Sequence, residues 1–152
     1  MNWNIARFLL VTVSPVSELR GGIPIGIEFT ELPHWSVLLI AVVANALMFF
    51  PIFFGLRLFY DRLLSRIPFF DRYLDSVRRR GKPLVDKYGF WGLTFLVALP
   101  LPITGVYTGT SLAWLLDMDW RKACPAAVLG VTIAGVIVFL ITRIALGLIR
   151  AP

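Results

Sequence analysis

The sequence has very little of the chemistry on which most enzymes and disulfide-bonded proteins depend. Cys124 is the only cysteine and His34 the only histidine among 152 residues. These counts exclude a disulfide framework, a CxxC pair and a cysteine-based metal cluster, and we expect neither a metal nor a cofactor. No serine or cysteine is spaced to pair with His34, and no phosphate-binding loop is present. The chain is therefore not expected to be an enzyme.

Charge is absent from two long stretches, residues 35–56 and 123–142. Each reaches the roughly 20 apolar residues that a helix needs to cross a hydrocarbon core about 30 Å thick. The chain as a whole is 58% hydrophobic, against about 45–50% for soluble domains. The sequence therefore predicts an integral membrane protein.

Charge is concentrated instead in residues 57–87, which contain nine of the 15 Lys and Arg residues but only four of the nine acidic ones. Apolar residues recur there at steps of three and four, which predicts amphipathic helices in the membrane interface. Such a basic segment marks the cytoplasmic side and contacts anionic lipid headgroups. No aromatic-basic platform for nucleic acid accompanies it. We expect a prokaryotic inner-membrane protein with this linker in the cytoplasm.

The apolar regions form two similar halves. Residues 3–16 and 91–103 are short and end in interrupted stretches, SPVSELRGGIP and LPLPITGVYTG, whereas each following apolar region is long enough to span. Interrupted hydrophobic segments at corresponding places in two halves indicate a transporter-like site at the membrane midplane. We therefore divide a single membrane domain, residues 1–152, into a first repeat (1–56), a basic amphipathic linker (57–87) and a second repeat (88–152).

Two topologies fit this pattern. Residues 3–27 and 91–116 either cross the membrane, which gives four spans and internal termini, or re-enter it as hairpins, which gives external termini. Broken backbone at membrane depth survives only where it is buried in protein or lines a wet cavity, which favours hairpins. The predicted fold is an all-α integral membrane protein with two inverted repeats. Each repeat is a re-entrant helical hairpin followed by a transmembrane helix, and interfacial amphipathic helices join the two.

Several sequence motifs carry a family resemblance. ELRGGIP, Asn45 and Pro51 in the next span, KYGFWGL and PLPITGVYTGTSLAWLL resemble the family of small multidrug export proteins. That family looks like a distant branch of the DedA/VTT superfamily. The resemblance implies paired re-entrant loops and activities such as translocation of polyprenyl phosphates, lipid scrambling or proton-dependent drug tolerance. DedA proteins carry arginines in the second loop, which this chain lacks, so Arg20 is the only guanidinium in an interrupted segment.

Glu18 is the predicted proton-coupling residue. An ionisable side chain within the membrane costs roughly 2.5–3.5 kcal/mol on insertion scales and usually marks a transport pathway. Burial and the neighbouring Arg20 act in opposite directions on its protonation. The alternative is a structural ion pair with Arg20, or a cap of the hairpin turn. Arg20 itself is predicted either to bind a phosphate or other anion or to neutralise Glu18.

Hydroxyl groups of the second loop are the other predicted substrate ligands, namely Thr104, Tyr107 and Thr108. Free N–H groups at the start of the following half-helix would favour an anion there, although threonines in membrane helices also bond their own backbone. Asn45 either faces the cavity or ties two helices together. The residues predicted to shape the two loops are Pro15, Gly21, Gly22, Pro24, Asn45, Pro100, Pro102, Gly105 and Gly109.

The predicted function is a proton-coupled membrane transporter of an amphiphile, such as a lipid-linked polyprenyl phosphate or a phospholipid. Two alternatives remain open: a small multidrug exporter of lipophilic cations, and a non-transporting membrane assembly factor. The expected partners are membrane lipids, the amphiphilic substrate and, as an option, a second copy of the chain in a homodimer.

Overall fold

A computed structural model describes residues 3–60, 68–99 and 105–149 of the chain. These residues form eight helices, and no strand occurs among them, which confirms the predicted all-α class. In chain order the helices are α1 (Trp3–Val13), α2 (Glu18–Phe29), α3 (His34–Leu47), α4 (Phe49–Phe59), α5 (Pro68–Tyr88), α6 (Phe90–Ala98), α7 (Val106–Leu115) and α8 (Trp120–Ile149).

Two helical segments are long and apolar enough to cross a membrane. The first is His34–Phe59, in which α3 and α4 continue each other across a single turn residue, Met48; the second is Trp120–Leu148 of α8. Their 26 and 29 residues correspond to about 39 and 43 Å at roughly 1.5 Å per residue, more than the hydrocarbon thickness of about 30 Å. Both predicted spans are thereby confirmed as membrane-length helices.

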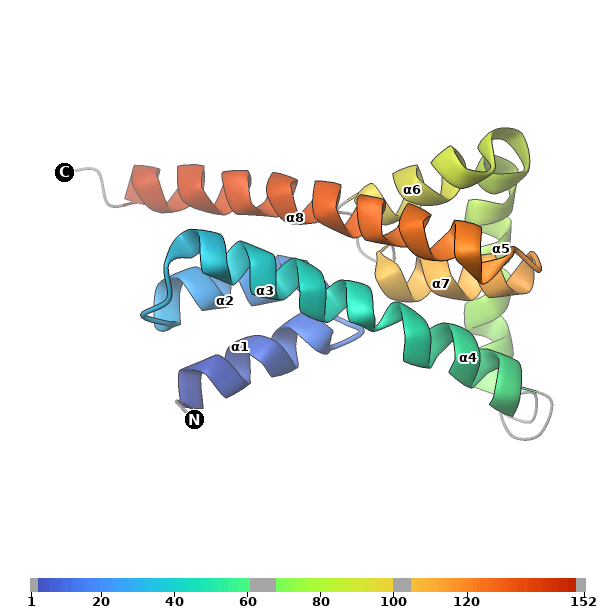
Figure 1. Cartoon of the computed structure of the whole chain (residues 1–152), viewed down its shortest axis with the longest axis horizontal. Helices are drawn as coiled ribbons and strands as arrows, with labels where there is room; N and C mark the ends of the chain where they lie inside the picture. The colour runs from blue at the N-terminus through green and yellow to red at the C-terminus, as the bar shows by residue number, and fades with distance from the viewer. Residues whose placement is uncertain (1–2, 61–67, 100–104, 150–152) are drawn as a thin grey trace.

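The shorter helices form two hairpins. α1 and α2 pack against each other across the turn at residues 14–17, and α6 contacts α7. In Figure 1 the first hairpin lies at the end of the molecule that holds both termini, and the second lies toward the opposite end. The turn of the first hairpin falls near the middle of the long axis. Each hairpin helix has only 9 to 12 residues and is too short to span the membrane alone.

The first break is shorter than the sequence predicts. Of the expected interruption SPVSELRGGIP only residues 14–17 lie outside a helix, because α2 begins at Glu18 and continues through Gly21, Gly22 and Pro24. A proline is tolerated in a membrane helix where neighbouring groups satisfy the freed backbone. The glycines serve packing instead: a Cβ at Gly22 would lie 2.1 Å from the hydroxyl oxygen of Thr12. In the second half, α6 ends at Ala98 and α7 begins at Val106, inside the predicted break, while Gly109 lies within α7.

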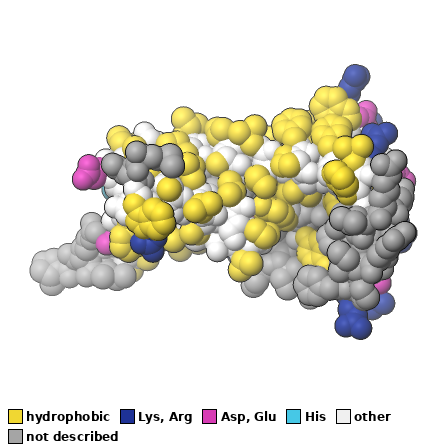
Figure 2. Space-filling model, turned by 90° about the horizontal axis from the view of Figure 1, so that it is seen from below, with side chains coloured by type: hydrophobic (Ala, Val, Ile, Leu, Met, Phe, Trp, Pro, Cys, Tyr) yellow, Lys and Arg dark blue, Asp and Glu magenta, His cyan; other side chains and the backbone are white. Residues whose placement is uncertain are grey.

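Helix α5 lies across the end of the molecule opposite the termini (Figure 1). It buries Leu74, Val77 and Val85 against a bundle that includes α6 and α7. Its described basic residues are largely exposed, among them Arg72, Arg78, Arg79 and Lys87. Figure 2 shows apolar side chains along the length of the body, with charged ones at its two ends and Lys and Arg mostly at the α5 end. The surface thus has an apolar band of the kind that a lipid bilayer covers.

Candidate functional site

The two hairpins meet at Glu18. This residue is the first of α2 and only 7% exposed, and its Oε1 atom accepts a hydrogen bond from the backbone N–H of Tyr107 at 3.5 Å, 89 residues away. Tyr107 lies in the first turn of α7, where backbone N–H groups have no partner within the helix. The positive end of the helix dipole also favours a negative charge there. The carboxylate of one hairpin therefore caps the half-helix of the other.

Gly105 makes room for that carboxylate. A Cβ atom at this position would lie 1.9 Å from Oε2 of Glu18 and 2.6 Å from its Cδ. The backbone of Gly105 also has φ +124°, a conformation that residues with a side chain rarely adopt. Two independent features therefore require glycine at the entry to α7.

Glu18 itself has an unusual backbone. Its φ is +47°, in the left-handed region that few residues other than glycine, asparagine and aspartate occupy. Its N–H donates to the carbonyl of Ser14 at 3.0 Å across the hairpin turn. Such strain, of about 1–3 kcal/mol, persists where the surrounding structure holds the residue in place, and it concentrates at functional sites.

Arg20 contacts the other helix of the second hairpin, α6, where that helix enters the hairpin turn. Its Nη2 atom donates to the carbonyl of Leu99 at 3.4 Å, and Leu99 is the C-cap of α6. A cation is favourable at this end of a helix because the last carbonyls carry partial negative charge. Helix α2 thus brings a negative group to the start of α7 and a positive group to the end of α6.

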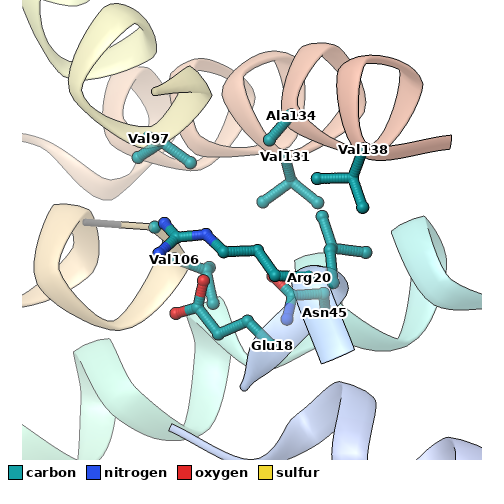
Figure 3. Close-up of a pocket in the computed structure, with 10 residues that line it drawn as sticks. Glu18, Arg20, Asn45, Val97, Val106, Val131, Ala134 and Val138 are labelled. Atoms are coloured by element: carbon teal, nitrogen blue, oxygen red, sulfur yellow. The ribbon is translucent and has the colours of Figure 1, made fainter. Parts of the chain in front are cut away.

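A small cavity lies beside these two charges. Its volume is about 10 Å³, and Glu18, Arg20 and Asn45 line it together with Gly105 and apolar residues, including Val131 and others of α8. Figure 3 shows Glu18 and Arg20 reaching into it from α2, and Asn45 from α3. The charges of Glu18 and Arg20 also interact electrostatically. The space suffices for about one water molecule, so this cavity as described has no room for a larger ligand.

Asn45 ties two helices together and also borders the cavity. It is fully buried, and its Nδ2 donates to the carbonyl of Thr12 at 2.9 Å, joining α3 to the last turns of α1. Asn45 thus makes a bond between helices, one of the two alternatives that the sequence left open. The Oδ1 atom has no hydrogen-bond partner among the described residues, and the residue lines the cavity.

The predicted hydroxyl ligands take different positions. The Tyr107 hydroxyl donates to the carbonyl of Val13 and so links α7 to the end of α1. Thr108 is buried against α5, with its Oγ1 3.5 Å from the hydroxyl of Tyr73, and it is not among the residues that line the cavity. Pro15 lies exposed in the first hairpin turn. Three other predicted residues lie outside the described part of the chain: Pro100, Pro102 and Thr104.

The sequence did not identify Val13, Leu99 or Thr12 as members of the site. All three contribute backbone carbonyls, to Tyr107, Arg20 and Asn45 respectively. A carbonyl group is common to every residue, so no residue type marks its role. The only available signal was position, because Val13 and Leu99 lie where the chain leaves a short apolar helix.

Comparison with known families gives one match. The model of a family described as "Putative small multi-drug export protein" matches residues 18–137, from the first residue of α2 well into α8. No curated protein and no solved structure matches the chain. The matched part contains Glu18, Arg20, Asn45 and Gly105, and it covers far more than half of the chain. The chain therefore belongs to the small multi-drug export protein family, a family of membrane export proteins rather than of enzymes.

Proposed function

We propose that this chain is a proton-coupled transporter that moves an amphiphilic substrate across the bilayer, with Glu18 as the proton carrier. One observation carries the proposal: a buried carboxylate lies where two short hairpins meet, in a cavity that is also lined by Asn45 and Val131, each about halfway along one of the membrane-length helices. A carboxylate at such a depth is costly and marks a transport pathway by default.

The same proposal includes the membrane topology. We assign the two hairpins as re-entrant segments of an inverted repeat, and the relation to the DedA/VTT superfamily rests on this assignment. Two observations support this assignment. The hairpin helices are too short to span the membrane, and in Figure 1 the two hairpins approach each other from opposite ends of the molecule, with both termini at the same end. The basic helix α5 at the other end favours a cytoplasmic location for that end.

The contacts of Glu18 suggest how protonation opens the site. The ionised carboxylate attracts the positive end of α7 and interacts with Arg20. When Glu18 takes up a proton, its attraction to both groups falls, and the hairpins can separate around the cavity. Release of the proton on the other side of the membrane closes them again. Alternating protonation thereby couples the proton gradient to substrate movement.

The proposed substrate is a lipid-linked phosphate or a phospholipid. A planar guanidinium suits a phosphate group, so Arg20 would exchange the Leu99 carbonyl for the substrate headgroup as the hairpins separate. Tyr107 and Thr108, with Thr104, are the proposed hydroxyl ligands. A second candidate substrate, a lipophilic cation, is favoured by the description of the family; it would pair with Glu18, and Arg20 would repel it.

Flux measurements in proteoliposomes test the proposal. A polyprenyl phosphate and a lipophilic cation are supplied side by side, with and without a pH gradient. We expect pH-driven flux of the phosphate by the wild type, its loss in Glu18→Gln, and wild-type flux in Glu31→Gln, which changes an exposed glutamate. Unchanged flux in Glu18→Gln would refute the proton-carrier role. Flux of the cation alone would select the second candidate, and flux of neither compound would favour an assembly factor.

A further inference from the structure

The turn of the first hairpin is strongly exposed. Pro15 and Val16 are both exposed, and Val16 is 89% exposed. The turn lies near the middle of the long axis (Figure 1). If the membrane-length helices cross the bilayer as proposed above, this turn faces the centre of the hydrocarbon core.

The backbone of the turn cannot face lipid in that position. Two carbonyls of the turn are satisfied: that of Ser14 accepts from the N–H of Glu18, and that of Ser17 accepts from the N–H of Gly21. Three backbone groups have no hydrogen-bond partner in the described part of the chain, namely the N–H of Val16 and the carbonyls of Pro15 and Val16. In hydrocarbon no water satisfies such groups, so irregular backbone at this depth is found only under protein or beside a water-filled cavity.

The surrounding side chains argue against water as the cover. Leu10, in the last turn of α1, is 65% exposed, and Val16 in the turn itself is 89% exposed. Together they give the turn an apolar rim. A wet vestibule would require a polar lining, so the cover is better supplied by another protein surface.

The turn is complementary to itself. It offers an N–H donor at Val16 and carbonyl acceptors at Pro15 and Val16 on one short segment. In a two-fold contact the same surface faces itself, with residue i of one copy against residue j of the other. The donor of one turn can then pair with an acceptor of the other, while the two Val16 side chains and the apolar rims pack together.

We propose that the chain forms a two-fold dimer in which residues 14–17 of one copy cover residues 14–17 of the other. This inference rests on the membrane orientation given under the proposed function. It also bears on the site, because Glu18 follows the turn directly and bonds to Ser14 across it. The dimer contact would hold Glu18 in its left-handed backbone conformation.

Disulfide trapping tests the dimer. In a Cys124→Ala background, which lacks the single native cysteine, Val16→Cys is oxidised with copper phenanthroline in proteoliposomes. We expect a covalent dimer whose yield persists as the protein is diluted with lipid. The control is Val136→Cys, also exposed and about halfway along α8, a helix that lies on the opposite side of the molecule from α1 in Figure 1. It should not cross-link.

Two other measurements make the outcome decisive. Single-molecule photobleaching of labelled wild-type chains in dilute vesicles should show two steps, and single steps would overturn the dimer. Rapid labelling of Val16→Cys by a charged thiol reagent, without cross-linking, would identify a wet vestibule and also overturn it. Cross-linking together with undiminished flux in Glu18→Gln would leave the dimer standing and refute only the transport mechanism.

Discussion

The carboxylate of Glu18 occupies the space that a side chain at Gly105 would fill, with Oε2 only 1.9 Å from the position of a Cβ atom there. The two residues come from different hairpins, so this contact fixes how closely the hairpins approach each other. It also explains how a carboxylate can be buried in this protein: the missing side chain lets it reach the start of α7, where the helix dipole stabilises its charge.

Substitution of Gly105 should therefore act as a substitution of Glu18 does. In Gly105→Ala we expect transport to fall to the level of Glu18→Gln, because the new methyl group displaces the carboxylate. The free energy of unfolding should fall by about 1–3 kcal/mol, the usual cost of a side chain in so rare a backbone conformation. Flux in proteoliposomes and denaturation in mixed micelles measure the two effects.

The matched control for this change is Gly55→Ala in α4, because no atom lies within 4 Å of a Cβ built there. It should keep full flux and gain up to about 1 kcal/mol of helix stability. Full transport by Gly105→Ala would show that the Glu18 carboxylate does not need its observed position.

Glu18 and Arg20 should be energetically coupled. In Glu18→Gln the guanidinium of Arg20 loses its negative neighbour, and in Arg20→Met the carboxylate loses its positive one. We expect the double variant to be less destabilised than the sum of the single variants, by about 0.5–3 kcal/mol, as for residues in contact. A double-mutant cycle on the free energy of unfolding measures this coupling.

An exposed ion pair in the same chain provides the comparison. Lys82 and Asp86 lie one helical turn apart on α5 at 2.9 Å, with both side chains about half exposed. Such pairs contribute only about 0.3–0.5 kcal/mol. If the Glu18–Arg20 coupling were no larger than this, the pair would not be an electrostatic unit of the site.

The spans and the short helices could be predicted from the sequence because each depends on local composition. Two uncharged stretches of sufficient length are visible without any tertiary information, and α6 ends at Ala98, directly before the predicted LPLPITGVYTG break. The extent of the first break could not be predicted. Gly21, Gly22 and Pro24 are local helix breakers, yet contacts with α1 keep α2 regular through them, and these contacts are set by tertiary packing.

The site was predicted in part for the same reason. Glu18 stands out because an acid is rare in such a chain, and Asn45 because it is a lone amide in an apolar span. Their partners could not be predicted, since the N–H of Tyr107 and the carbonyl of Leu99 carry no residue-specific signal. The fit between Glu18 and Gly105 arises only when two distant hairpins meet, and no local pattern contains it.

Asn45 should stabilise the fold more than it contributes to transport. Asn45→Leu keeps the branching and the number of side-chain heavy atoms but removes the hydrogen bond to the Thr12 carbonyl. Interhelical hydrogen bonds in membranes contribute about 0.6 kcal/mol on average and up to about 1.7 kcal/mol, so we expect a loss in that range. Thr132→Val is the control, because its exposed hydroxyl bonds only its own helix. An equal loss in both variants would contradict a tie between α1 and α3.

The two topologies predict opposite labelling of the ends of α8. Lys122 is exposed in its first turn, at the α5 end of the molecule, and Gly147 is exposed near the other end with no atom within 4 Å of a Cβ built there. If the hairpins re-enter, Lys122 is cytoplasmic, because residues 91–116 return to the side of the basic linker, and Gly147 is external. If those residues cross instead, the two locations are exchanged.

In a Cys124→Ala background, an impermeant maleimide added to intact cells should therefore label Gly147→Cys and spare Lys122→Cys. Permeabilised cells, in which both should react, control for reactivity. The reverse pattern in intact cells would establish four crossings and remove the inverted repeat on which the midplane position of Glu18 depends.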